Sequence, residues 1–144
     1  MNRYVLGLLC VSVLAACGGD AAPPRFTDLG NGTVQDNVNG LVWQQGFSPE
    51  SQDQEASLFY CNGLDLDGTG WTLPTKTELL TILDTGHSPP IDEAYFSMRA
   101  GGDAFWSSSP DIDVPSNGWL VNFDFGGFPN SVDATVPAYA RCVR

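Results

Sequence analysis

The stretch "GWTLPTKTELLTILD" (70–84) decides the fold around it, because it contains a helix together with its start signals. Pro74 ends an extended segment, Thr75 is a favourable N-cap, and Glu78 stands three residues later, the spacing of a capping box. The apolar residues that follow recur at helical spacing and predict one buried stripe: Leu79, Leu80, Ile82 and Leu83. We therefore expect a helix here that packs one face on a core.

The preceding segment, "SPESQDQEASLFYCNGL" (48–64), predicts another helix. Ser51 and Gln54 have the spacing of a capping box, and acidic residues lie where they favour the helix dipole. One apolar face recurs at helical spacing and consists of Leu58, Cys61 and Leu64. The middle of the chain is thus expected to hold two helices.

Short β-prone pieces surround two Asn-Gly pairs in "RFTDLGNGTVQDNVNGLVWQQ" (25–45). Asn-Gly is a strong hairpin signal, because both central residues of a tight two-residue turn need positive φ. The pairs predict three small strands, near 26–28, 33–36 and 41–44.

After the helices the chain becomes β-prone again. In "GWLVNFDFGG" (118–127) the apolar alternation is that of a strand with one buried face. The expected core face consists of Trp119, Val121, Phe123 and Phe125. "YARCVR" (139–144) repeats the alternation, which places Cys142 on the core face and Arg141 opposite it. With a short helical turn expected at 91–96, the order of strands, two helices and strands indicates an α+β domain.

The N-terminus has the pattern of an export signal. Arg3 precedes an apolar run at 5–14, which is too short to span a bilayer, and small residues follow it. The sequence "LAAC" (14–17) resembles a bacterial lipobox, in which the cysteine is lipidated. The alternative is an ordinary signal peptide with an incidental cysteine.

We accordingly expect a signal peptide at residues 1–16, a lipidated tether at 17–24 that begins with Cys17, and one domain at 25–144. Several acyl chains anchor a protein durably where one chain does not. Because Gly18 stands where an aspartate usually signals inner-membrane retention, the expected location is the cell envelope, at the outer membrane or cell surface.

Charge excludes several classes of partner. The chain has 6 basic and 17 acidic residues, and removal of the signal peptide takes away Arg3 and no acid, so 5 basic and 17 acidic residues leave a net charge of −12. Since the remaining basic residues are scattered, nucleic acid and sulfated polyanions would be repelled. The expected partners are the membrane, through the lipid anchor, and an unidentified carbohydrate or protein ligand.

Cysteine usage agrees with export. Cys10 would leave with the signal peptide and Cys17 would carry lipid, so Cys61 and Cys142 remain as a candidate disulfide in an oxidising compartment. Their bridge would close a loop of 81 residues. The alternative is a reactive Cys142, which would need a nearby histidine, and the chain has only His87.

Five segments in order resemble the Lcl C-terminal domain family, named for the Legionella collagen-like adhesin, over nearly all of 25–144. They are "RFTDLGNGTVQDNVNGLVWQ", "YCNGLDLDGTGWTLPTKTELLTILD", "IDEAYF", "FWSSSP" and "YARCVR". The resemblance implies a C-type-lectin-like α+β fold with two helices packed on small antiparallel sheets, and one disulfide at Cys61 and Cys142. The family commonly has arginine before Leu-Pro-Thr, where this chain has Thr72.

The resemblance does not transfer a ligand. The namesake adhesin binds sulfated glycosaminoglycans, whereas scattered cations in a domain of charge −12 would not neutralise several sulfates at once.

The stretch "AFWSSSPDIDVPSNGW" (104–119) holds the residues closest to a chemical motif. Serine catalysis needs a base oriented by an acid, and His87 lies in a Pro-rich loop with no Gly-x-Ser-x-Gly in the chain. We favour a structural role for Ser107–Ser109, which would satisfy backbone groups where a strand ends. The binding hypothesis is a shallow polar and aromatic face lined by Trp106, Ser108, Asp111, Asp113, Asn122 and Asp124.

The turn "DLDGTG" (65–70) raises a calcium hypothesis, with Asp65 and Asp67 as candidate ligands. Aligned on the EF-hand loop, the twelfth position is Lys76, where a bidentate glutamate is required. No cofactor is otherwise expected, and a solvated turn is the simpler interpretation.

The sequence thus predicts a non-enzymatic envelope lipoprotein whose lectin-like domain recognises a ligand or surface by non-covalent binding. Two alternatives stay open. One is a structural or assembly component of the envelope that binds another protein, and the other is a display scaffold with variable C-terminal loops.

Overall fold

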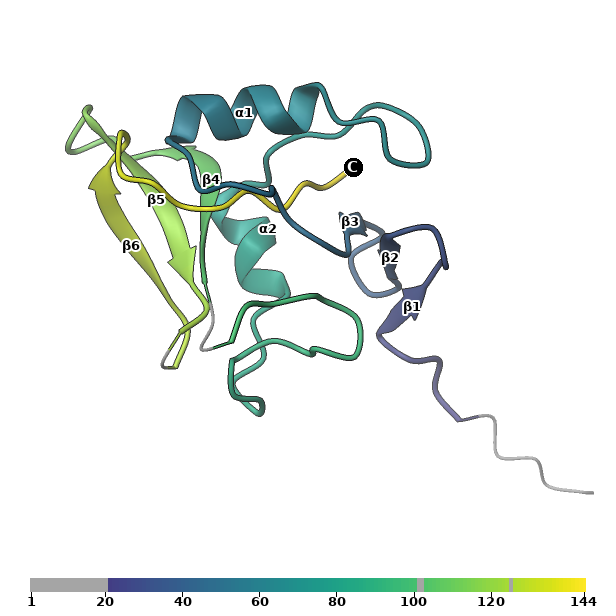
Figure 1. The fold of residues 1–144 in the computed structure, drawn as a ribbon. Coiled ribbons are helices and arrows are strands. Elements are labelled where there is room, and N and C mark those ends of the chain that lie inside the picture. Colours follow the sequence, from purple (N-terminus) through teal and green to yellow (C-terminus); the bar gives the residue numbers. More distant parts are fainter. Residues whose placement is uncertain (1–20, 101–102, 125) are drawn as a thin grey trace, which may run out of the picture.

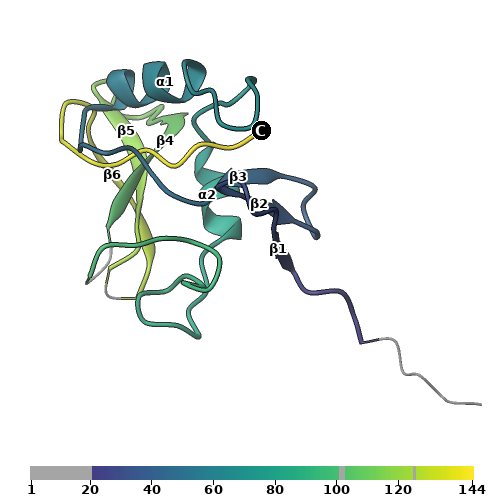
Figure 2. The ribbon, with the colours of Figure 1, turned by 45° about the vertical axis from the view of Figure 1, so that its right-hand side comes forward.

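The computed structural model describes residues 21–100, 103–124 and 126–144. The expected signal peptide, the first half of the tether (17–20, with Cys17) and Phe125 lie outside the described residues. The elements follow in the order β1–β2–β3–α1–α2–β4–β5–β6, with α2 between two small sheets (Figures 1 and 2). In this part of the chain no helix has the length and apolar character needed to cross a membrane.

The first sheet is an antiparallel meander in the order β1-β2-β3. Its strands are β1 (Phe26–Asp28), β2 (Thr33–Asp36) and β3 (Val42–Gln44), which confirms the three predicted strands, with the third one residue shorter at its start. The expected two-residue turns are wrong. Gly32 and Gly40 have positive φ, at 82° and 73°, but neither preceding asparagine does, because both connections are longer loops.

Two helices follow. In α2 (Lys76–Thr81), the Thr75 side chain accepts the amide of Glu78 and the Glu78 carboxylate accepts the amide of Thr75, which confirms the capping box. The first helix, α1 (Gln54–Asn62), begins later than expected. Its N-cap is Asp53, whose carboxylate accepts the Ala56 amide, so the Ser51 capping box is wrong.

The central strand of the second sheet is buried on both faces. Its strands β4 (Ala104–Pro110), β5 (Asn117–Asn122) and β6 (Phe128–Asp133) pair antiparallel in the order β4-β5-β6. On one face Val121 joins the core cluster of Leu79 from α2, and on the other Leu120 joins the cluster of Cys61 from α1. The expected division of β5 into one buried and one exposed face is therefore wrong.

The C-terminal segment runs from β6 beneath α1 toward the first sheet (yellow in Figure 1). Residues 139–144 do not form a regular strand, but single bridges join Tyr139 to Phe105 and Val143 to both Trp43 and Thr72. The segment therefore links the two sheets. At 91–96 the expected helical turn is one turn, in which the amides of residues 95 and 96 donate to the carbonyl of residue 92.

The disulfide between Cys61 and Cys142 is confirmed. The two sulfur atoms lie 2.08 Å apart, the Cα atoms 5.4 Å apart, and both residues are fully buried. The bridge joins α1 to the C-terminal segment. The cysteine pair is thus part of the core beneath α1 and not a reactive thiol.

Arg141 lies on the inside of the molecule, contrary to the alternation in "YARCVR". Its side chain is fully buried, and its guanidinium donates to the carbonyl oxygens of Gln44, Gln45 and Ser97. The same group lies over three aromatic rings, those of Phe47, Phe96 and Phe105, at 5.0–5.8 Å from the ring centroids. The neighbouring cysteine is buried as well, because the segment lies between packed layers on both sides.

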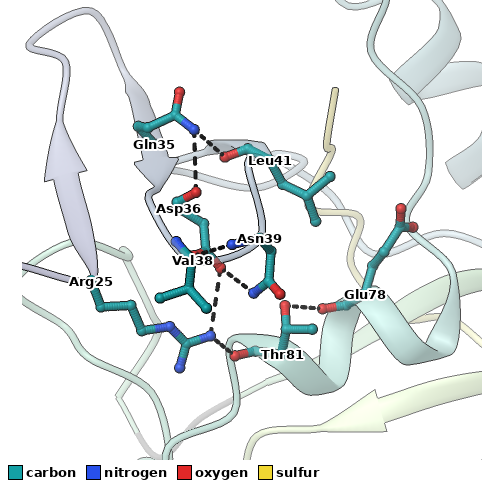
Figure 3. A network of polar contacts seen from close by, with 8 residues as sticks. All are labelled: Arg25, Gln35, Asp36, Val38, Asn39, Leu41, Glu78 and Thr81. Carbon is teal, nitrogen blue, oxygen red and sulfur yellow. Dashed lines mark hydrogen bonds and ion pairs between the residues drawn. The ribbon is translucent and has the colours of Figure 1, made fainter.

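A polar network fastens the first sheet to α2 (Figure 3). The fully buried carboxylate of Asp36 accepts the amides of Val38 and Asn39 and the side-chain amide of Asn39, which holds the 37–41 loop. The Arg25 guanidinium lies 3.5 Å from the same carboxylate and donates to the carbonyl of Thr81 at the end of α2. Asp36 therefore organises both a hairpin and a contact between elements.

Replacing Asp36 with asparagine is expected to lower the free energy of unfolding at neutral pH by about 1–3 kcal/mol, since buried donors lose a charged acceptor. Burial alone would raise the pKa of Asp36, but the hydrogen bonds from Asn39 and Val38 and the charge of Arg25 outweigh it and lower the pKa below the ordinary 3.8. The ionised Asp36 carboxylate therefore contributes its full stabilisation above pH 3.8. This stabilisation is lost as the pH falls through the lower pKa of the folded state.

Urea unfolding at neutral pH and at pH values below 3.8 measures this effect. The difference between wild type and Asp36→Asn should shrink in acid. Glu93→Gln, at an exposed acidic position on the 91–96 turn, serves as the control and should leave stability almost unchanged. An equal difference at both pH values would contradict the assigned role of the carboxylate.

Candidate functional site

The serine run of β4 is occupied by structural hydrogen bonds. The buried hydroxyl of Ser107 donates to the carbonyl of Trp119 at 2.6 Å and accepts the amide of Ser109 at 3.2 Å. The Ser109 hydroxyl accepts the amide of Lys76 at the start of α2 at 3.0 Å. His87 lies in the loop after α2, where its Nδ1 is 3.1 Å from a carboxylate oxygen of Asp84. These hydrogen bonds agree with the structural role that the sequence favours for Ser107–Ser109.

Trp106 does not line a surface, so its assignment to a ligand face is wrong. Its side chain is fully buried in the core cluster of the disulfide, and its indole N–H donates to the carbonyl oxygens of Gln52 and Val136. The bulky ring fills the space between β4 and α1. Ser108, the next candidate residue, is half-buried, and its amide donates to the carbonyl of Pro74.

Asp111 is buried and holds the loop that joins β4 to β5. One carboxylate oxygen accepts the amides of Asp113 and Val114 at 2.9 and 3.3 Å, and the other accepts the hydroxyl of Ser131 from β6. The hydrogen bonds from Ser131 and from the Asp113 amide lower the pKa of Asp111, against the opposing effect of burial. Asp113 itself is exposed.

Asn122 and Asp124 lie at the other end of β5, so the six candidate residues do not form one face. The Asn122 side chain accepts the amide of Asp124 and shapes the turn that leaves the strand. Asp111 is close to Asn117, the first residue of β5. The five residue steps from Asn117 to Asn122 separate the pair Asp111 and Asp113 from the pair Asn122 and Asp124 by roughly 17 Å. An alternating strand presents residues along its whole length, and sequence alone did not show at which end ligand loops would gather.

Two loops meet at the Asp111 end of the sheet, and we call residues 111–116 and 133–137 the loop platform (Figures 1 and 2). The amide of Ala134 donates to the carbonyl of Ser116 at 3.0 Å, which joins the loops. The Asp133 carboxylate accepts the amide and hydroxyl of Thr135 at 2.9 and 2.6 Å, and these hydrogen bonds lower the pKa of Asp133.

The loop platform displays apolar side chains that sequence reasoning missed. They are Ile112, 88% exposed, Val114, 44%, and Val136, 39%. The signal was present in "PDIDVPSN", where apolar residues stand between acids and prolines in a stretch too rich in turn formers to be buried. Of the six candidate ligand residues, only Asp111 and Asp113 belong to this platform.

Each of the five basic side chains in the described residues lies over an aromatic ring. Lys76 is 3.7 Å from the ring centroid of Trp119, and Arg144 is 4.6 Å from that of Trp71. The remaining three are Arg25 over Phe26, Arg99 over Tyr139, and Arg141 over its three rings. The positive charges are thus held in separate places by packing, and most of the acidic residues face solvent.

A cationic side chain from the C-terminus contacts the turn proposed for calcium. Arg144 donates to the carbonyl of Asp67 at 2.9 Å and lies 3.5 Å from its carboxylate, whereas Asp65 is exposed nearby in the chain. Calcium needs six to eight oxygen ligands. Among the described residues no three His, Cys, Asp or Glu side chains gather as a metal site, so the structure adds no support, and calcium binding stays a prediction.

Comparison with known protein families gives a match over most of the domain. The family model described as the Lcl C-terminal domain matches residues 32–144. This range includes β2 and β3 of the first sheet, both helices, the whole second sheet and the disulfide, and β1 precedes it. No curated protein matches the chain. The match covers most of the chain and includes the whole loop platform.

Proposed function

Since the chain belongs to the Lcl C-terminal domain family, we propose that it is a recognition module of the cell envelope that binds its ligand non-covalently through the loop platform. In this proposal lipid on Cys17 anchors the protein, the tether keeps the domain near the outer membrane, and the disulfide-braced core holds the binding loops. The ligand class is a protein or an uncharged carbohydrate, because a domain this acidic repels polyanions.

The observation that carries the proposal is the exposure of apolar side chains on loops that are fixed from within. Burial of a fully exposed isoleucine is worth about 1.5–3 kcal/mol, so exposure of Ile112 forgoes stability that a folded core would gain. The hydrogen bonds of Asp111 and Asp133 hold the loops in this arrangement. A rigid, partly apolar surface supports binding, because little conformational entropy is lost when it is covered.

A non-catalytic function is supported by the hydrogen bonds of the serine run in β4. The hydroxyls of Ser107 and Ser109 are engaged with backbone groups, and the Ser107 hydroxyl is buried away from substrate. A serine nucleophile needs a base within hydrogen-bond reach. The proposed mechanism therefore requires contact and no bond-making step.

Binding of the purified full chain to envelope fractions tests the proposal. We expect the combined variant Ile112→Ser, Val114→Ser and Val136→Ser to weaken binding at least about tenfold, since each substitution removes apolar contact area. Val38→Ser is the matched control, because Val38 is 73% exposed on the hairpin of the first sheet, away from the platform. Equal binding by wild type and combined variant would overturn the assignment of the platform.

Labelling with a radioactive fatty acid tests the anchor separately. We expect the label to enter the wild-type chain and to be absent from Cys17→Ser, which should also leave the membrane fraction. Label retained in Cys17→Ser would contradict lipidation at this residue.

A further inference from the structure

The charge around the loop platform points to a particular class of ligand. Asp113 and Asp133 are exposed on the platform itself. The amide of Gln54 donates to the carbonyl of Ala134 at 3.0 Å, which brings the start of α1 and its exposed acids, Asp53 and Glu55, to the same end of the molecule. The apolar side chains therefore have acidic neighbours on two sides.

The nearby positive charge does not neutralise these acids. Lys76 is the basic residue that acts on Asp111, and its ammonium lies over the ring of Trp119. The Ser131 hydroxyl that bonds Asp111, together with the bonds from Thr135 to Asp133, lowers the pKa of both carboxyls. Both thus stay ionised in mildly acidic as well as neutral surroundings.

We infer that the loop platform binds a cationic polypeptide segment, whose apolar side chains cover Ile112, Val114 and Val136 while its lysines or arginines face the surrounding carboxylates. The inference rests on the proposed recognition function and names the partner class for that site. Apolar contact in the centre and complementary charge at the rim is the usual division of a protein interface. An anionic membrane or polyanion would meet the same acids with repulsion.

A short labelled peptide in which lysine alternates with leucine is the probe, with fluorescence anisotropy of the purified full chain as the readout. We expect saturable binding that weakens as salt is raised, because rim charges are screened. A peptide with glutamate in place of lysine, and another with serine in place of leucine, should each bind about tenfold more weakly or worse.

Two sets of variants separate the two parts of the surface. Ile112→Ser with Val136→Ser should weaken binding at all salt concentrations, whereas Asp113→Asn with Glu55→Gln should weaken it chiefly at low salt, since both of these acids are exposed. The matched controls are Val38→Ser for apolar exposure and Glu93→Gln for charge, both away from the platform, and both should bind as wild type does.

Three outcomes would overturn the inference. An equal loss of peptide binding in the control variants would show attraction to the acidic protein as a whole. Equal binding of the glutamate peptide would remove the charge requirement. Tighter binding to anionic vesicles than to the peptide would make a membrane the ligand. If the peptide fails but envelope binding still depends on Ile112, the partner class is wrong and the recognition function stands. If envelope binding is also unaffected, both are wrong.

Discussion

Replacing Cys61 and Cys142 together with alanine is expected to lower the free energy of unfolding by about 4–5 kcal/mol. The bridge closes a loop of 81 residues that begins near the end of α1 and contains α2 and the whole second sheet. Without it the unfolded chain gains the conformational freedom of that loop, and the chain-entropy relation gives the stated magnitude for this length. This is a large share of the 5–15 kcal/mol typical of a folded domain.

Denaturant unfolding of the double variant, and of the wild type with and without reductant, measures the effect. The m-value of the double variant should rise together with its loss of stability, because a chain without the cross-link exposes more surface on unfolding. The reduced wild type should behave as the double variant does. A loss below about 1 kcal/mol would mean that the loop is already constrained in the unfolded state.

Replacing Arg141 with methionine is expected to lower the free energy of unfolding by about 3–5 kcal/mol, because three carbonyl oxygens lose a charged donor at once. Methionine fills much of the volume and keeps contact with the rings, so the loss reports the hydrogen bonds more than a cavity. Arg141→Lys should be nearly as harmful, since a compact ammonium does not reach three carbonyls in the plane of a guanidinium.

The pH dependence separates charge from packing. Burial lowers the pKa of Arg141 from its ordinary value to about 9, with Asp103 opposing the shift, so the group is still protonated at neutral pH. The folded state binds this proton less tightly than the unfolded chain does. The cost of burying the charge is therefore fully present below about pH 9 and is relieved as the pH rises from there toward the ordinary pKa of arginine. The loss caused by Arg141→Met should therefore grow as the pH rises through this window.

Thermal or urea unfolding at pH 7 and above pH 9 provides the measurement. Arg99→Met is the matched control, because Arg99 is exposed and donates to the hydroxyl of Tyr139. It should change stability by no more than about 0.5 kcal/mol. Similar losses for Arg99→Met and Arg141→Met would show that the buried position has no special role.

The predicted parts of the fold are those governed by neighbours in sequence. The capping box of Thr75 and Glu78 needs only residues three apart, and it was found as expected. Asp53 took the place of Ser51 because both are good N-caps, and the bridge between Gln52 and Ala138 keeps the chain extended until residue 53. That bridge joins residues far apart in sequence, which local propensity does not include.

The candidate site was less predictable, because exposure depends on the layers that cover a strand. Trp106 and Asp111 fall in one aromatic and polar stretch, yet α1 covers Trp106 and the loop closes over Asp111. Ile112, the residue that follows Asp111, is exposed. A sequence pattern gives the side of a strand, but not whether a second layer lies on that side.

By itself the sequence determined the α+β order, the second helix with its cap, the three strands of the first sheet and the disulfide pair, because these follow from short-range hydrogen bonding, periodicity and a small choice of cysteines. Only the tertiary structure decided that Arg141 points inward and that apolar loops gather at one end of the second sheet. The reason is that α1, α2 and the C-terminal segment cover both faces of β5, so the free energy of burial depends on packing between distant segments.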